Sequence, residues 1–241
     1  MAPLDQVLDA DAWQVCSLIG NSNLGRNYYL AGGTALALQI CHRKSNDLDY
    51  FQRGNEEKIN FDQIYSEIIN YIPEKNIRVD FRKTDQATMS VNNTKVTFLA
   101  YPYPLMESLV DGEKICKGRL KGIKLASPAE ISLMKAYAIG RRTSYRDYVD
   151  LYELLRMGKV TLDYILKKAQ QKYNTGGEIL FSPKLFLQQL VYTKDVKDKD
   201  VALQSVLGST VSSEAIDEFF GRIVSGELKS QTTIRRRETR P

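Results

Sequence analysis

A strand, a glycine pair, a helix and a second strand follow one another within residues 28–51, and this order constrains the fold most. Tyr28–Ala31 is short and apolar, as a buried strand is, and Gly32-Gly33 ends it. Thr34–Cys41 is predicted to form a helix and Asp47–Phe51 a second strand. The polar loop after the helix is long enough to bring the second strand back beside the first.

Asp47 and Asp49 stand two residues apart on the second predicted strand. Both carboxylates should therefore project from one face, about 6–7 Å apart by the strand rise, while Leu48 points into the core. Such a pair can hold one or two magnesium ions, and two ions can clamp the attacking and leaving oxygens of a phosphoryl transfer. The simpler alternative is the solvent-exposed polar face of an edge strand, because D-x-D often arises by chance.

Gly32-Gly33-Thr34 lies between a predicted strand and a predicted helix. Glycines let phosphate oxygens approach the backbone, and the free amides at a helix N-terminus attract anions. Thr34 can cap the helix or contact a phosphate. A plain strand-to-helix turn explains the glycines equally well when they are taken alone. Beside the carboxylate pair, however, the turn predicts one pocket for a triphosphate and its metal.

The histidine and cysteine content limits which metal this pocket can take. His42 is the single histidine, and the three cysteines are scattered without metal-site spacing. This excludes a multi-histidine or Cys/His zinc site and favours Mg²⁺ or Mn²⁺ held by carboxylates. The cysteines are expected to be reduced thiols of a cytoplasmic protein. His42 follows a predicted helix, which favours a capping or packing role over catalysis.

The hydrophobic period changes along the chain and predicts two domains. Residues 61–71 have helical spacing, the strand around Ile77, Val79 and Phe81 alternates as a half-buried strand does, and Asn92-Asn93 is typical of a hairpin turn. One more strand is expected over 120–125. The first part, residues 1–126, is therefore mixed α/β with a small, largely antiparallel or mixed sheet.

From Ser127 onward the chain has only helical patterns. Ser127 can cap a helix, Pro128 suits its first position, and Glu130 can close a capping box. The predicted domains are residues 1–126, a helical domain over 127–228 and a basic, disordered tail over 229–241. The predicted helices of the second part span 128–139, 145–157, 161–173, 183–192 and 213–225.

Charge and hydropathy limit the partners. The net charge of +5 is compatible with a polyanionic partner such as RNA without demanding one. No apolar run approaches the roughly 20 residues of a membrane helix, and the acidic start does not resemble a signal peptide. We therefore expect a cytoplasmic protein with no membrane contact.

The glycine turn followed by D-x-D resembles the first motif of the polymerase-β-like nucleotidyltransferase superfamily. The run LAGGTALAL…HRKSNDLDYF is more narrowly similar to the AbiEii/AbiGii toxin family, as are MKAYAIGRRTSYRDYVDLYELL and LFLQQLVYTKDV downstream. The likeness spans most of residues 1–195. It implies an α+β fold, with an N-terminal polymerase-β-like nucleotidyltransferase domain followed by a C-terminal helical domain.

The resemblance also implies roles for individual residues. The glycine turn would hold phosphates, the aspartate pair would bind magnesium, a helix lysine would meet the triphosphate, and a further aspartate would position a substrate group or act as a base. Two residues of the loop before the aspartates would steady the nucleotide. The residues that would hold phosphates are Gly32, Gly33 and Thr34, and those that would bind magnesium are Asp47 and Asp49. The helix lysine is Lys135, the further aspartate is Asp147, and the two loop residues are Arg43 and Ser45.

Local alternatives stand beside the roles of the second block. A mid-helix lysine such as Lys135 is usually a solvated surface residue, and Asp147 lies in a first helical turn, where the helix dipole alone favours an acid. Asp150, one turn later, could pair with Arg142 or Arg146.

One departure from the superfamily pattern concerns a third carboxylate. Enzymes of this type usually carry it on a later strand, but the matching run KVTFLAY has no acid. Asp80, on the run IRVDF, is a possible substitute. Loss of the third acid would weaken a second metal site and leave the general base undefined, unless Asp147 serves.

The sequence therefore predicts an enzyme that moves NMP from an NTP to RNA, such as a tRNA 3′ end, or to a protein side chain. By the same resemblance it would be the toxin of a toxin–antitoxin or abortive-infection system, neutralised by a cognate antitoxin. Two alternatives keep the pocket: an NTP-dependent kinase-like toxin, and a degenerate protein that only binds nucleotide or RNA.

Overall fold

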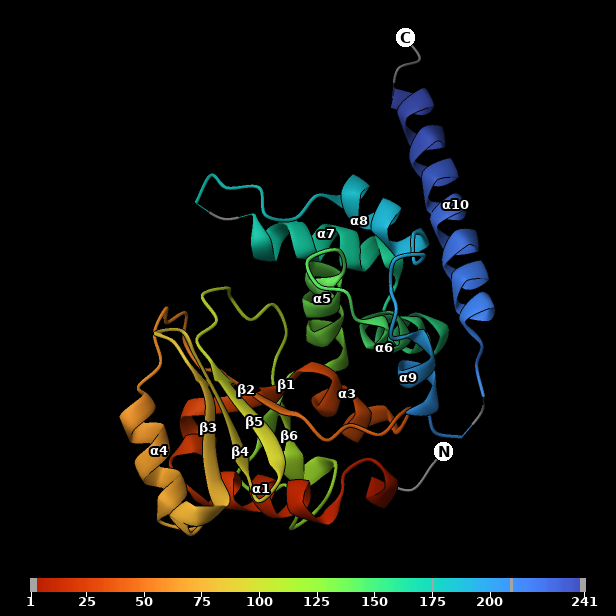
Figure 1. The fold of residues 1–241 in the computed structure, drawn as a ribbon. Helices are drawn as coiled ribbons and strands as arrows, with labels where there is room; N and C mark the ends of the chain where they lie inside the picture. Colours follow the sequence, from red (N-terminus) through yellow and green to blue (C-terminus); the bar gives the residue numbers. More distant parts are fainter. Residues whose placement is uncertain (1–3, 175, 209, 239–241) are drawn as a thin grey trace. The chain divides into compact units, whose positions relative to one another are not determined.

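One mixed sheet of seven strands, in the order β3-β4-β5-β2-β1-β7-β6, organises the first half of the chain (Figure 1). The structure is a computed structural model that describes residues 4–174, 176–208 and 210–238. The sheet is mixed because β1 pairs antiparallel with β2, while β2 pairs parallel with β5 and β1 with β7. The strands are β1 (Tyr28–Ala31), β2 (Leu48–Gln52), β3 (Ile77–Arg82), β4 (Gln86–Val91), β5 (Thr94–Leu99), β6 (Val110–Asp111) and β7 (Lys124–Leu125).

The core of this half lies under the central strands. Leu48 and Tyr50 of β2 are fully buried, and the Tyr50 ring stacks on Phe98 of β5 at 5.5 Å between centroids. The Tyr50 hydroxyl also contacts Cys16 Sγ at 3.7 Å, which fixes α1 against this face. Alternation then leaves Asp49 and Phe51 on the opposite face. The helices are α1 (Ala10–Asn21), α2 (Leu24–Asn27), α3 (Gly32–Ile40) and α4 (Phe61–Ile69).

The hairpin prediction at Asn92-Asn93 is confirmed, and the burial of β3 is not. Asn92 and Asn93 have φ of 46° and 65°, as the turn between β4 and β5 requires. Val79 and Phe81, predicted to be half-buried, are 42% and 40% exposed. β3 is the edge strand of the sheet. Its alternating apolar residues therefore do not mark a face that is covered by other elements.

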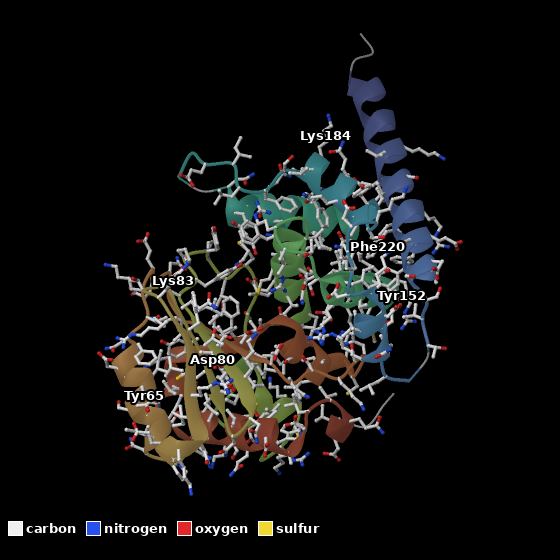
Figure 2. The ribbon with its side chains drawn as sticks, in the orientation of Figure 1. Tyr65, Asp80, Lys83, Tyr152, Lys184 and Phe220 are labelled. Carbon is white, nitrogen blue, oxygen red and sulfur yellow. The ribbon has the colours of Figure 1, made fainter. Side chains whose placement is uncertain are left out.

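Six helices follow the sheet within the described residues. They are α5 (Pro128–Ala138), α6 (Tyr145–Arg156), α7 (Leu162–Tyr173), α8 (Pro183–Val191), α9 (Lys199–Gln204) and α10 (Ser213–Glu238). Aromatic contacts join several of them: Tyr148 of α6 meets Phe220 of α10, and Tyr152 meets Phe219. Figure 2 labels Tyr152 and Phe220. No helix in the described ranges is both long enough and apolar enough to cross a membrane.

The chain divides into two compact units, residues 1–131 and 132–241, and the division falls inside α5. The domain boundary predicted after residue 126 lies just before it and stays a prediction. Residues 229–238 of the predicted tail continue α10 as a helix, and no glycine or proline interrupts residues 227–238. The disorder expected of this tail stays a prediction. Residues 239–241 of that tail lie outside the described part.

Candidate active site

The register of β1 and β2 places the glycine turn beside the second aspartate. Ala31, the last residue of β1, pairs with Asp49, and α3 begins at the next residue, Gly32. Asp47 immediately precedes β2, and the fully buried Leu48 separates the two acids. Both carboxylates are partly exposed. Leu48 is thus in the core as predicted, and the acids on either side of it are partly exposed.

Gly32 lies directly beside the carboxylate of Asp49. Its φ is +64°, a conformation that side chains rarely adopt, and a Cβ built there would lie 3.0 Å from Asp49 Oδ2. The absent side chain thus lets the Asp49 carboxylate lie directly against the backbone at the start of α3.

Replacing Gly32 with alanine should impair the site more than the fold. A residue with a Cβ at this φ costs about 1–2 kcal/mol, and the new methyl group would also push on Asp49. Gly118→Ala is the matched control, because Gly118 has φ +82° and nothing within 4 Å of a built Cβ. We expect similar losses of melting temperature in both variants, but a fall of up to roughly a hundred-fold in the nucleotide transfer that the sequence predicts, in Gly32→Ala alone. Equal activities would contradict this reading.

Thr34 binds the loop that carries the acids. It is 2% exposed, its hydroxyl lies 2.7 Å from Ser45 Oγ, and it donates a short hydrogen bond to the Asp47 carbonyl. The expected helix cap is wrong: the N-cap position is Ala31, which places Thr34 third in α3. The Thr34 side chain thereby sets the position of Asp47 relative to the turn.

The loop before the acids begins with two buried polar residues, His42 and Arg43. Ser45 donates its backbone N–H to the Val7 carbonyl at 2.9 Å. Arg43 is only 3% exposed and its Nη1 donates to the Lys44 carbonyl at 3.0 Å, while His42 is 5% exposed. Arg43 is thus a buried cation two residues before Ser45, inside the segment that Thr34 ties to α3.

Thr97 occupies the strand position next to Asp49 where a third acid would be expected. The β2–β5 register pairs Asp49 with Thr97, whose hydroxyl lies 3.4 Å from that of Thr88. Asp80, the suggested substitute, is on β3, three strands from β2 and therefore about 14 Å away. It binds Arg78 at 2.6 Å and Ser90 at 2.8 Å (Figure 2). Asp80 is accordingly no part of the Asp47–Asp49 group.

Lys135 and Asp147, predicted to act together, do meet in the second unit. Lys135 is 3% exposed, and its Nζ lies 2.7 Å from Asp147 Oδ1 and 2.5 Å from Asp150 Oδ2. Arg142 adds two hydrogen bonds of 2.7 Å to Asp147. The surface alternative for Lys135 is therefore wrong, because α6 supplies two buried carboxylates to it. Asp150, which the sequence suggested could pair with an arginine, contacts Lys135. Its i, i+3 spacing from Asp147 places both carboxylates on one face of α6 and could have indicated this contact.

The electrostatics of this cluster hold Asp147 in its ionised form. Burial alone would raise the pKa of Asp147, but the charge of Lys135 and the hydrogen bonds and charge of Arg142 outweigh it. The pKa of Asp147 accordingly lies below its ordinary value. A carboxylate of this kind is a weak proton acceptor near neutral pH.

Comparison with known proteins identifies the chain. The profile of the family described as "Nucleotidyl transferase AbiEii toxin, Type IV TA system" matches residues 15–229. The chain belongs to the AbiEii nucleotidyltransferase family.

Three further proteins are similar to this AbiEii chain. An uncharacterised protein of Aquifex aeolicus is 29% identical over 204 residues, covering 85% of this chain and 89% of its own length. A crystal structure of a candidate nucleotidyltransferase from H. pylori shares the fold with a TM-score of 0.51 and 16% identity, covering 92% of this chain and 94% of that one. An antigenic nucleotidyltransferase-like protein from Paracoccidioides brasiliensis has a TM-score of 0.45 and 16% identity, over 86% and 96% of the chains.

The donor set of the AbiEii chain suits a hard divalent cation. Among the described residues, no group of three or more histidine, cysteine, aspartate or glutamate side chains is arranged to hold a metal. Magnesium is commonly bound through one or two carboxylates plus substrate phosphates and water. Asp47 and Asp49, the latter directly beside the N-terminus of α3, fit that pattern.

Proposed function

We propose that this AbiEii-family chain is a metal-dependent enzyme that transfers NMP from an NTP to an acceptor. The observation that carries the proposal is the approach of Gly32 to the Asp49 carboxylate at the N-terminus of α3. A helix N-terminus attracts phosphate and a carboxylate attracts a cation. Their juxtaposition supports a site for a metal–triphosphate, and it does so in a chain of a nucleotidyltransferase family.

Different residues of the first unit would bind the metal, the phosphates and the rest of the nucleotide. Asp47 and Asp49 would bind Mg²⁺ or Mn²⁺, and the amides of Gly32 and Gly33 would face the phosphates. Thr34 positions Asp47 through the loop, and Arg43 and Ser45 would steady the nucleotide from the same loop. When bound, the metal would neutralise charge that develops on the phosphate oxygens.

The proposed reaction exchanges a phosphoanhydride bond for a phosphoester bond. An acceptor hydroxyl oxygen forms a bond to the α-phosphorus of the NTP, and the bond from that phosphorus to the bridging α–β oxygen breaks. Pyrophosphate leaves with the electron pair, and the acceptor proton passes to water or a base. The lowered pKa of Asp147 disfavours it as that base. A catalytic role for Lys135 stays a prediction.

The acceptor and the cellular role belong to the same proposal. The net charge of +5 suits RNA, such as a tRNA 3′ end, and a protein side chain is the other acceptor considered. The family description names a toxin of a type IV toxin–antitoxin system. We infer that the transfer is toxic and that a cognate antitoxin counteracts it.

A second candidate function rests on Thr97. The residue that pairs with Asp49 on the neighbouring strand β5 is a threonine and not an acid. The carboxylates of Asp47 and Asp49 therefore gain no third carboxylate from that position. A site of this kind could bind nucleotide or RNA without chemistry.

Labelled nucleotides separate these functions. The purified protein is incubated with Mg²⁺, total RNA and cell protein, and with each NTP labelled at the α or the γ phosphate, and the products are separated on gels. We expect α label on one acceptor class, release of pyrophosphate, and loss of both with EDTA. Label from the γ position alone would establish phosphate transfer instead. Metal-dependent NTP binding with no labelled acceptor would favour the binding protein.

A further inference from the structure

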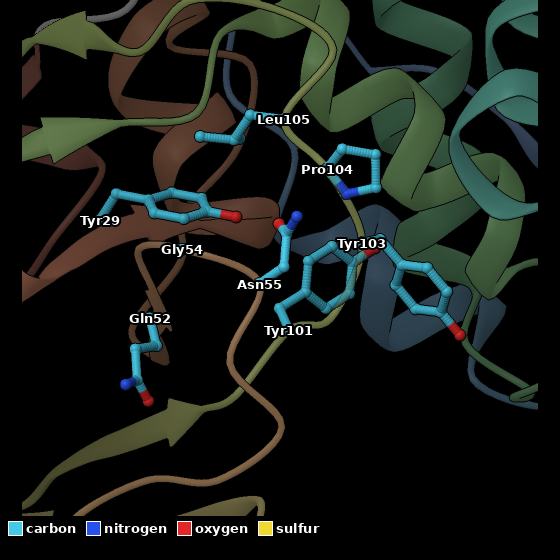
Figure 3. A pocket seen from close by; sticks show the side chains of 8 residues that line it. All are labelled: Tyr29, Gln52, Gly54, Asn55, Tyr101, Tyr103, Pro104 and Leu105. Carbon is cyan, nitrogen blue, oxygen red and sulfur yellow. The ribbon is translucent and has the colours of Figure 1, made fainter. Parts of the chain in front are cut away.

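A small cavity of about 200 Å³ lies on the sheet unit, beyond the carboxylate pair (Figure 3). Strand β1 contributes Tyr29 and strand β2 contributes Gln52. The loop after β2 adds Asn55, and the loop after β5 adds Tyr101, Tyr103 and Leu105. Figure 3 shows the Tyr29 hydroxyl pointing toward Asn55, with Leu105 beside the Tyr29 ring.

The lining chemistry of this tyrosine pocket is aromatic and neutral. The eight described residues that form it include three tyrosines and two amides, and none of the eight carries a charge. Aromatic faces stack on planar rings of any base, and amide groups can pair with the donors and acceptors at the edge of a base. A phosphate would find no cation in this lining, whereas a flat, uncharged heterocycle finds complementary surfaces.

Tyr29 of the pocket shares a sheet face with Asp49. In the β1–β2 register Tyr29 pairs with Phe51, and two residues along Ala31 pairs with Asp49, so the offset is about 7 Å by the strand rise. Phe51 stacks on Tyr29 at 5.9 Å and meets the edge of Tyr101 at 4.9 Å. An aromatic surface therefore runs from the pocket toward Asp49, within the reach of one nucleotide.

The wall formed by the loop after β5 is held in place. Glu130 is fully buried, and its Oε2 accepts backbone N–H bonds from Met106 at 3.0 Å and Glu107 at 3.1 Å. Burial and the nearby charge of Glu130 raise the pKa of Tyr29. Its hydroxyl thus stays protonated at neutral pH and remains a hydrogen-bond donor.

We propose that the tyrosine pocket binds a nucleobase, stacked on the tyrosine rings and hydrogen-bonded at its edge by Asn55. This inference rests on the proposed function, which brings nucleotides to Asp49. The base can belong to the NTP or to the terminal nucleotide of an RNA acceptor. Both present the same ring chemistry to the pocket.

The test compares Tyr103→Ala with Tyr103→Phe in the full chain, with Tyr71→Ala as an aromatic control outside the pocket. Tyr71 is 50% exposed and follows α4. Calorimetry with Mg²⁺ measures the Kd of each NTP, of inorganic tripolyphosphate and of a single-stranded RNA of mixed sequence. Loss of one stacked base should weaken binding roughly five- to hundred-fold.

The probes assign the source of the base. Weaker NTP binding in Tyr103→Ala, with tripolyphosphate binding unchanged and Tyr103→Phe normal, places the donor base in the pocket. Weaker RNA binding alone places an acceptor base there. Unchanged Kd values for both NTP and RNA in a folded Tyr103→Ala would overturn the inference. If the wild type binds neither NTP nor tripolyphosphate, the proposed function fails, while the RNA comparison still tests the pocket.

Discussion

Replacing Asp49 with asparagine should lower nucleotide transfer by roughly a hundred- to ten-thousand-fold, because the metal that it would hold supplies several kcal/mol of charge stabilisation. Asparagine keeps the size of the side chain beside Gly32 and removes its charge. The protein should therefore stay folded, with nearly unchanged melting temperature. The rate of incorporation of α-labelled NTP at saturating Mg²⁺ measures the effect.

Asp80→Asn is the matched control, since Asp80 is an acid of the same sheet, three strands from β2. Its carboxylate serves Arg78 and Ser90, so the control variant should keep wild-type transfer. Growth on expression gives a second measurement: Asp49→Asn should relieve any growth arrest and Asp80→Asn should not. Arrest of equal strength in wild type and Asp49→Asn would show that the carboxylate does no chemistry in the cell.

The sheet half of the site could be predicted because its signals are local. Gly32, Asp47 and Asp49 lie within one strand–helix–strand segment, and the alternation around Leu48 fixes which side chains share a face. The choice between Thr97 and Asp80 as the neighbour of Asp49 could not be made this way. It depends on the strand order β3-β4-β5-β2, which no short pattern contains.

The burial of the Lys135 charge is the other property that could not be predicted from the spacing of residues in the sequence. The sequence around Lys135 is typical of an exposed lysine in a helix. Its burial depends on two carboxylates of α6, which the pattern of α5 itself does not contain. The short strand β6 and the short helix α9 were missed for a related reason. Each of them, Val110–Asp111 and Lys199–Gln204, is too brief to show a period and is held by its neighbours in space.

Replacing Lys135 with alanine should destabilise the second unit by about 3–5 kcal/mol, because it removes the cation shared by two buried carboxylates. For a chain of this size the melting temperature should fall by roughly 6–20 °C. Thermal melting followed by circular dichroism measures the change. Lys167→Ala is the control, because Lys167 pairs with Asp163 at 2.9 Å on the exposed surface of α7 and should melt like the wild type.

A combined variant tests whether unpaired charge is the cause. Lys135→Met together with Asp147→Asn and Asp150→Asn removes the three buried charges at once. It should recover part of the stability lost in Lys135→Ala, since a neutral buried set carries a smaller desolvation cost. A triple variant that is less stable than Lys135→Ala would show that packing, and not charge, dominates at this position.

The pH dependence of melting gives an independent test of the same cluster. The folded pKa of Asp147 lies below its ordinary value of 3.8, so its ionised form is favoured in the folded state. The corresponding stability is fully present above about pH 5 and is lost as pH falls through 3.8 toward the lower folded pKa. The wild type should therefore lose stability over this acid range more steeply than the triple variant, which has no carboxylate there to protonate. Parallel acid curves for the two proteins would contradict a stabilising role for ionised Asp147.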